Sequence, residues 1–312
     1  MISDIEKGVL SQDHKYIAKA ITLIDNESSS SDKLLSNLFP HMKDTFRIGI
    51  TGPPGCGKST LTDKLIDKYT KKNLTVAVLC IDPTSPYTGG AILGDRIRMS
   101  KHISKQIFIR SIASRDASGG LSPSIEKIAC ILDAAGFDLI IFETVGVGQI
   151  ELEIVKTADS ILVLLNPESG DEIQMLKAGL MEIGDIFVIN KSDRDGADKL
   201  LVSLKNYLPK KSITNNKWTP MAVKTIAINN IGVSELVKIV EEHQKLIKNS
   251  GRLIKKYNQR YIDSVKRYVN NFLNDEFWTD EKHKILLDES SQPLINKKSP
   301  QILADNLLSI DE

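Results

Sequence analysis

Short apolar runs alternate with amphipathic segments between about residues 46 and 227. The segments between the runs favour helices, notably Lys58–Tyr69, Ser124–Ala135, Asp171–Ile183 and Ala197–Leu208. The runs are rich in Ile and Val and bounded by Gly, Pro, Asp or Asn, which is typical of strands buried on both faces. They are Phe46–Thr51, Val76–Ile81, Ile107–Ile112, Leu139–Phe142, Ile161–Leu165, Ile186–Ile189 and Val223–Ala227. This alternation predicts an α/β fold with a mostly parallel central sheet flanked by helices.

The two ends of the chain have a purely helical pattern. Apolar residues recur at helical intervals before residue 46, and two long helices are expected at Val233–Lys248 and Leu253–Phe277. The second carries an apolar stripe, which either packs on its own domain or forms a self-association arm. We expect an N-terminal helical extension (1–45), a nucleotide-binding core (46–231) and a C-terminal helical extension (232–312).

Composition narrows the class of protein. The chain has 312 residues, with 41 basic and 40 acidic side chains, and this balance argues against a nucleic-acid binder. It has no run of 18 apolar residues that would span a membrane. The first residues lack a secretory signal, so we expect a cytoplasmic protein, or a mitochondrial matrix protein if a transit peptide has been removed. Three dispersed cysteines indicate a reducing compartment and no structural zinc.

A phosphate-binding loop is the strongest motif. The residues Gly52, Pro53, Pro54, Gly55, Cys56, Gly57, Lys58, Ser59 and Thr60 fit G-x-x-x-x-G-K-S between a strand and a helix. Backbone N–H groups of such a loop surround phosphates at the positive end of the helix dipole. Lys58 adds charge for the outer phosphates, and the Ser59 hydroxyl can ligate Mg²⁺. The motif predicts binding of a nucleoside triphosphate.

A second motif indicates which base is bound. Asn190, Lys191 and Asp193 form N-K-x-D directly after the strand Ile186–Ile189. The Asp193 carboxylate can accept hydrogen bonds from N1–H and the 2-amino group of guanine, and adenine offers neither donor. We expect Lys191 to lay its stem along the base and Asn190 to tie this loop to the phosphate loop. GTP is therefore preferred over ATP.

The segment after the strand Leu139–Phe142 is a candidate for metal binding and γ-phosphate sensing. Glu143 can hold Mg²⁺ directly or through water, and the Gly146 N–H can contact the γ-phosphate. Val147 stands where small GTPases usually carry the glutamine that places the attacking water, so we expect slow intrinsic hydrolysis. Gln149 is either a substitute for that glutamine or a switch residue.

Two further acids flank a Gly-rich stretch. Asp82 ends the strand after the phosphate-loop helix, and Asp95 follows Gly89 and Gly90. Carboxylates suit a hard cation such as Mg²⁺, whereas Asp-Pro and Gly-Gly are also ordinary turn formers. Their spacing alone leaves both interpretations open.

Taken together, these motifs resemble the MeaB/ArgK-type GTPases, the methylmalonyl-CoA mutase-associated group in the metallochaperone-related (SIMIBI) branch of the P-loop GTPases. The similarity is carried by Gly49–Gly55, Asp82–Met99, Glu143–Glu151 and Asn190–Asp193, and it runs from about Gly8 to Leu308. It implies a GTPase that chaperones an adenosylcobalamin-dependent methylmalonyl-CoA mutase or a related acyl-CoA mutase. Such proteins gate cofactor delivery and protect the mutase.

The resemblance also implies residue roles. Asn166–Lys177 would couple nucleotide state to the mutase, Ala227 would offer its backbone N–H to the base, and the C-terminal helices would form a homodimer. The cofactors would be GTP or GDP and Mg²⁺. The phosphates and the metal would be held by Lys58, Ser59 and Thr60. The acids around Mg²⁺ would be Asp82, Asp95 and Glu143. The catalytic set would be Lys58, Asp82, Glu143 and Gly146.

Two other functions agree less well with the sequence. A metallochaperone GTPase delivering nickel or zinc would usually carry a His-rich stretch or paired cysteines, whereas this chain has five scattered histidines and no Cys pair. A small-molecule kinase or transport-associated ATPase would bind ATP, against which the guanine-reading Asp193 argues.

Overall fold

The computed structural model describes residues 2–26, 30–83, 104–114, 123–144, 150–167, 179–211 and 218–311. Within it the chain divides into two compact units, Met1–Lys256 and Tyr257–Glu312.

A parallel sheet of seven strands forms the centre of the first unit, with the strand order β3-β2-β4-β1-β5-β6-β7. The strands are β1 (Phe46–Thr51), β2 (Val76–Pro83), β3 (Ile107–Ser114), β4 (Leu139–Thr144), β5 (Ser160–Leu165), β6 (Ile186–Ile189) and β7 (Met221–Lys224). All residues of β1, β4, β5 and β6 are buried. Continuous apolar runs in the sequence therefore correspond to strands covered on both faces, as expected.

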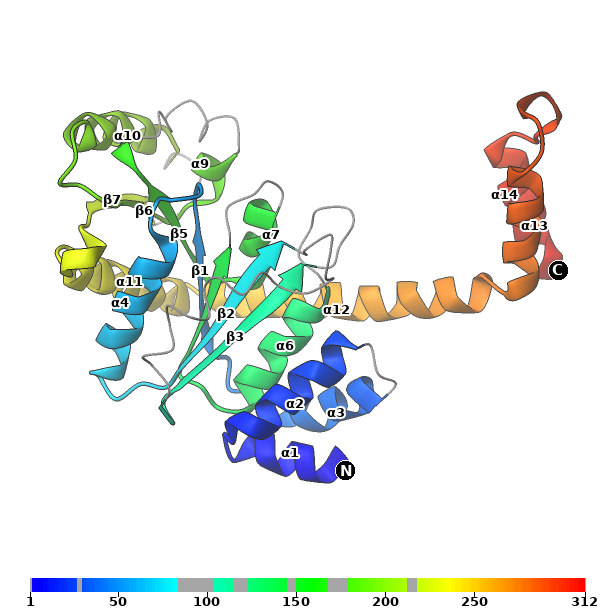
Figure 1. The fold of residues 1–312 in the computed structure, drawn as a ribbon, viewed down its shortest axis with the longest axis horizontal. Helices are drawn as coiled ribbons and strands as arrows, with labels where there is room; N and C mark the ends of the chain where they lie inside the picture. Colours follow the sequence, from blue (N-terminus) through cyan, green and yellow to red (C-terminus); the bar gives the residue numbers. More distant parts are fainter. Residues whose placement is uncertain are drawn as a thin grey trace. The chain divides into compact units, whose positions relative to one another are not determined.

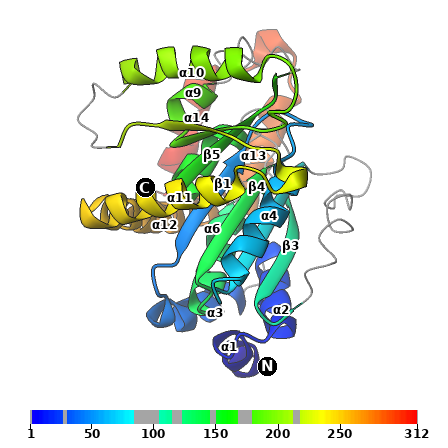
Figure 2. The same ribbon diagram turned by 90° about the vertical axis from the view of Figure 1, so that its left-hand side faces the viewer.

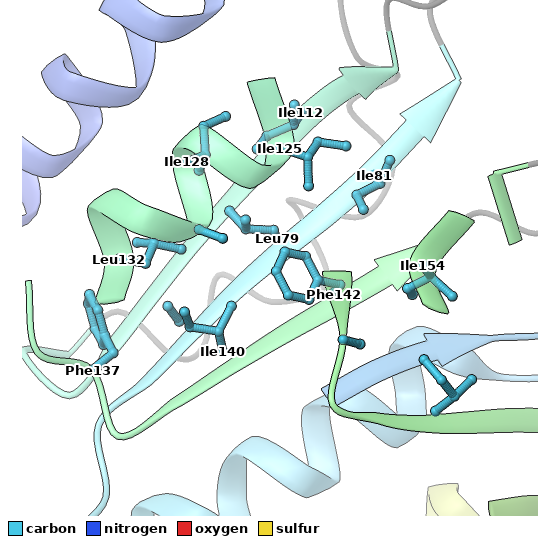
Figure 3. Close-up of a cluster of buried hydrophobic side chains, with 14 of the residues drawn as sticks. Leu79, Ile81, Ile112, Ile125, Ile128, Leu132, Phe137, Ile140, Phe142 and Ile154 are labelled. Atoms are coloured by element: carbon cyan, nitrogen blue, oxygen red, sulfur yellow. The ribbon is translucent and has the colours of Figure 1, made fainter. Parts of the chain in front are cut away.

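Helices cover both faces of this sheet (Figures 1 and 2). One face packs against α4 (Lys58–Thr70) and α11 (Val233–Asn249). The other packs against α6 (Pro123–Ala134), α7 (Ile150–Thr157) and α10 (Ala197–Lys211). In Figure 3 the apolar side chains of α6 face those of β2 and β4 in one continuous layer, which includes Ile128, Leu132, Leu79, Ile140 and Phe142.

The N-terminal helices extend this second layer. They are α1 (Ile2–Leu10), α2 (His14–Asp25) and α3 (Ser30–Leu38), followed by the 3-10 turn η1 (Phe39–His41). Their buried residues recur at three- and four-residue intervals, as in Ile17, Ile21 and Ile24, and they join the same core as α6. The helical extension expected before residue 46 is thus part of the packed first unit.

One expected strand is displaced. The run Val223–Ala227 predicted the last strand, but β7 spans Met221–Lys224 and is half exposed. From Ile226 the chain turns back to make an antiparallel bridge with Ile231, and Ala227–Asn229 forms the 3-10 turn η4. Of the helix expected at Asp171–Ile183, the described residues contain only α9 (Leu180–Ile183), and 168–178 lie outside the described residues.

The second unit is entirely helical where it is described. Helix α12 (Arg252–Phe277) begins in the first unit, and its residues from Tyr257 onward belong to the second. It is followed by α13 (Asp280–Ser290), η5 (Leu294–Asn296), α14 (Pro300–Leu308) and η6 (Ser309–Asp311). The side chains of Thr279 and Ser299 cap α13 and α14 by accepting backbone N–H groups.

Little of the second unit's apolar surface is buried. Among its described apolar residues only Leu303 and Leu307 are buried. Large apolar side chains of α12 are exposed along the length of the helix: Tyr261, Ile262, Val265, Tyr268, Val269, Phe272 and Leu273. No helix in the described part of the chain has the length and apolar character needed to cross a bilayer.

Candidate nucleotide site

The strand order places the phosphate loop at a reversal of topology. Strand β1 lies between β4 and β5, so the chain builds one half of the sheet on each side of β1. In parallel α/β sheets, ligands bind beyond the carboxyl ends of the strands at such a point. The phosphate loop follows β1 at this edge and leads directly into α4.

Two glycines of this loop are required by close contacts. Gly52 has φ +140°, and a Cβ there would lie 2.2 Å from the carbonyl oxygen of Leu164 in β5. Gly57 has φ +94°, and a Cβ there would lie 2.4 Å from Nδ2 of Asn190. Both are therefore places where the backbone needs a left-handed or crowded conformation that only glycine adopts freely. The loop lies close to β5 at its start and close to Asn190 of the N-K-x-D motif at its end.

Lys58 lies folded over the loop. Its ammonium donates to the carbonyl oxygens of Gly52 at 2.6 Å and Pro53 at 3.0 Å, and the side chain is buried. These bonds place a positive charge at the centre of the loop, next to the N-terminus of α4. Backbone N–H groups at that helix end add positive potential, so the whole loop favours an anion.

Asn190 joins three separate segments at the site. Its Nδ2 donates to the carbonyl oxygen of Cys56 at 2.9 Å, and its Oδ1 accepts from Oγ1 of Thr225 at 3.1 Å and from the Ala227 backbone N–H at 3.0 Å. The side chain is only 3% exposed. The expected tie between this motif and the phosphate loop is confirmed, and Thr225, which the sequence reasoning did not assign to the site, belongs to the same network.

The other residues of the N-K-x-D motif lie beside this network. The Ser192 backbone N–H donates to the carbonyl oxygen of Thr225 at 3.1 Å, and Lys191 has φ +55°. Asp193 is exposed, so its carboxylate is accessible to a base. The Ala227 N–H, expected to contact the base, donates to Asn190 here; its contact with the base stays a prediction.

A hydroxyl and a carboxylate meet at the carboxyl end of β4. Oγ of Ser59 donates to Oε1 of Glu143 at 2.6 Å, and Glu143 is 3% exposed. Next to them, Oγ1 of Thr144 bonds with Oγ1 of Thr51 at 3.1 Å. The hydroxyl at the first turn of α4 and the carboxylate of β4 are oxygen ligands of the kind that Mg²⁺ prefers, so this pair fits the expected metal position.

Part of the predicted set cannot be placed. The backbone of Asp82 pairs with Ala113 near the end of β2, at the same edge of the sheet as β1's end. Asp95, Gly146, Val147 and Gln149 lie outside the described residues, as does most of Asn166–Lys177. Their roles stay predictions.

One edge of the parallel sheet carries all the features described above. They are the phosphate loop, the Lys58 ammonium, the Ser59–Glu143 pair and the hydrogen bonds of Asn190. They define the class of protein: a P-loop nucleotide-binding protein.

Comparison with known proteins supplies the family. The profile described as Methylmalonyl Co-A mutase-associated GTPase MeaB matches residues 17–282, and the chain belongs to this family. A GTPase of Pyrococcus abyssi is 44% identical over 88% of this chain and 85% of its own. The mitochondrial methylmalonic aciduria type A homolog of Caenorhabditis elegans is 31% identical over 88% of this chain and 73% of its own. A solved structure of a LAO/AO transport system kinase is 26% identical, with a TM-score of 0.72, over 99% of this chain and 97% of that one.

Proposed function

We propose that this protein binds GTP with Mg²⁺ at the edge formed by β1, β4 and β6, hydrolyses it slowly, and chaperones a methylmalonyl-CoA mutase or related acyl-CoA mutase by gating adenosylcobalamin delivery. The observation that carries the nucleotide part is the Asn190 network, because it connects the base motif to the phosphate loop through buried hydrogen bonds. A kinase for an adenine nucleotide would have no use for the adjacent Asp193.

Within this proposal the phosphates lie in the loop Gly52–Gly57. Lys58 exchanges its bonds to the loop carbonyls for bonds to phosphate oxygens, and Thr60 lies in the same first turn of α4. Ser59 and Glu143 hold the metal, together with Asp82 and Asp95. A bound Mg²⁺ would neutralise charge that develops on the phosphates during transfer.

Base selection is assigned to three residues. Asp193 accepts the guanine N–H groups, Lys191 covers the base with its alkyl stem, and Asn190 fixes both relative to the phosphate loop. Because Asn190 is buried, its bonds are little screened by water. Slow hydrolysis follows from Val147, whose side chain can neither donate nor accept a hydrogen bond to water.

The client enzyme is proposed from kinship. The family is named for its association with methylmalonyl-CoA mutase, and one relative is named for methylmalonic aciduria. In this account hydrolysis times cofactor transfer to the mutase in the cytoplasm, or in the mitochondrial matrix if a transit peptide has been removed.

A homodimer through the C-terminal extension (232–312) is part of the same proposal. The apolar side chains of α12 are exposed in the single chain, for example Tyr261 at 57% and Phe272 at 65%. A contiguous exposed apolar face of this kind is typical of an interaction surface. Of the residues of α12, Arg260 is buried, so the helix buries little surface to offset its conformational entropy, and a second copy packed on α12 would stabilise it.

The client is tested by co-purification and kinetics with a purified methylmalonyl-CoA mutase. We expect a complex whose stability depends on the bound nucleotide, and a GTPase rate that rises when the mutase is added. A matched trial uses a nickel enzyme in place of the mutase. Stimulation by the nickel enzyme and none by the mutase would contradict the cobalamin assignment and favour metal delivery.

A further inference from the structure

An arginine lies on the core-facing side of the edge strand β3. Phe108 and Ile112 on this side are buried in the layer shared with α2 and α6. Side chains two residues apart in a strand point to the same face, so Arg110, between them, occupies a position where an apolar residue would otherwise fit. It pairs in register with the buried Leu79 of β2. A guanidinium at such a place needs a specific reason.

The head group of Arg110 has little to bind within the described residues. Its Nη2 donates to Oγ1 of Thr22 at 3.3 Å, which is long for a hydrogen bond. The Thr22 hydroxyl donates its own hydrogen to the carbonyl oxygen of Ala18 at 2.9 Å, and toward Arg110 it acts as the acceptor. A guanidinium carries five N–H donors in a planar fork. Most of that fork is available to a ligand.

The guanidinium borders a cleft of about 580 Å³ between α1, α2 and β3. This volume lies in the range of small-molecule sites. Its lining is mostly apolar, with a second cation and one carboxylate: Asp4, Ile5, Tyr16, Ala18, Lys19, Thr22, Leu23 and Arg110. The Lys19 ammonium lies 5.2 Å from the centre of the Tyr16 ring. The cleft thus has two cationic side chains, Arg110 and Lys19, one carboxylate, Asp4, and an otherwise mostly apolar lining. This combination is complementary to an amphipathic anion.

The walls of this cleft are held in place by packing. Ile5 of α1 is buried, and α1 and α2 are so close that a Cβ on Gly8 would lie 2.2 Å from Cγ of Tyr16. Figure 1 shows α1 and α2 side by side next to α6. A preformed wall lowers the entropy lost on binding, so the cleft suits a ligand of small size.

We propose that this cleft binds a small amphipathic anion, a carboxylate or phosphate attached to an apolar body, with Arg110 and Lys19 as its anion-binding residues. The planar fork of Arg110 can bind two oxygens of such a group at once, and Ile5 and Leu23 contact the apolar body. The site is separate from the nucleotide edge and does not depend on the function proposed above.

The test is a calorimetric titration of the full-length protein with octanoate and with octyl phosphate, using 1-octanol as the neutral probe. The variants are Arg110→Gln and Lys19→Gln, with Lys15→Gln as the matched control, because Lys15 is an exposed lysine of the same helix that does not line the cleft. Urea unfolding of each variant, measured in parallel, reports whether it is folded.

We expect saturable binding of at least one anion at millimolar concentration or below. Arg110→Gln and Lys19→Gln should each weaken it by about tenfold or more, because each removes a charge-assisted contact; Lys15→Gln should not. Octanoate binding alone would identify a carboxylate site, and octyl phosphate alone a phosphate site.

Three results would overturn the proposal. They are no saturable binding of either anion, binding of octanol as tight as that of the anions, or equal losses in the Lys15→Gln control. In the first case Arg110 would be a charge that protects an exposed sheet edge from pairing with another chain. Capture of an acidic protein by the cleft with no binding of either small anion would likewise contradict a small-molecule site.

Discussion

Replacing Asn190 with alanine tests the network at the centre of the nucleotide site. The change removes three hydrogen bonds: one to the Cys56 carbonyl oxygen, one from the Thr225 hydroxyl and one from the Ala227 N–H. Each bond contributes about 0.5–1.5 kcal/mol net, and the buried Ala227 N–H that loses its acceptor costs about 1–3 kcal/mol. These terms overlap, so the expected loss in free energy of unfolding is about 2–5 kcal/mol.

Nucleotide affinity should fall as well. The same bonds hold the phosphate loop against the base loop, so a nucleotide would have to order both loops when it binds. A cost of only about 1.4 kcal/mol corresponds to a tenfold weaker GDP affinity, and we expect at least about that. The assay combines urea unfolding with fluorescence titration of a labelled GDP.

Thr225→Val is the graded control. It keeps the shape of the side chain and removes one of the two bonds to Oδ1 of Asn190, so it should cost about 1 kcal/mol. In the double variant the two losses should not add, because the residues share one bond. The reasoning would be refuted if Asn190→Ala changed the free energy of unfolding by less than about 0.5 kcal/mol and left GDP affinity unchanged. In that case the network would not hold the two loops together.

Three further predictions test other parts of the account. Asp193→Asn should weaken GTP binding by about a hundredfold or more and improve xanthosine triphosphate binding; retained GTP affinity in a binding assay would disprove the base assignment. Gly52→Ala should lower the free energy of unfolding by about 3 kcal/mol or more, because its Cβ would collide with the Leu164 carbonyl. Gly55 has φ +76° and open space around it, so Gly55→Ala should cost only about 1–2 kcal/mol. Equal costs of the two substitutions in urea unfolding would refute this reasoning. Burial lowers the pKa of His243 and is the largest effect on it. The charges of Lys256 and Arg252 lower this pKa as well, whereas those of Asp185 and Asp159 raise it. Below about pH 6.5 the unfolded chain therefore binds more protons at His243 than the folded chain does, so the free energy of unfolding falls as the pH drops through this range. His243→Gln should flatten this pH dependence in urea unfolding. An unchanged slope would assign the pH dependence to other groups.

The sheet could be predicted well from the sequence where its strands are buried on both faces. The β1 and β6 runs coincide with the observed strands at both ends, because a strand inside the sheet is covered on both faces and is therefore mostly apolar. Arg47 of β1 is buried as well, and its Nη1 pairs with Oε1 of Glu126 at 2.7 Å. Strand β7 lies at the edge and is half exposed. The apolar run 223–227 therefore marked the turn and bridge that follow the strand as well as the strand itself.

The site was predictable to the extent that its residues are contiguous. The phosphate loop and N-K-x-D are short strings whose placement follows from the strands before them. The partners of Asn190 lie 134 and 35 residues away, at Cys56 and Thr225, and spacing does not reveal such contacts. Thr225 carries one signal that could have been used, namely a hydroxyl at the end of the strand beside the base loop.

Long-range packing in the N-terminal segment also escaped the sequence reasoning. Periodicity indicated helices there but not what they pack against. That Arg110 of an edge strand reaches Thr22 of α2 depends on how α2 lies beside the sheet. A single polar residue in an apolar strand gives no indication of the cleft it borders.

A calorimetric titration with GTP, GDP and ATP in the presence of Mg²⁺ tests the central claim most directly. The account predicts micromolar or tighter binding of GTP and GDP and no measurable binding of ATP, because the exposed Asp193 and the buried Asn190 network form a guanine-reading loop. Micromolar ATP binding with none of GTP would contradict it.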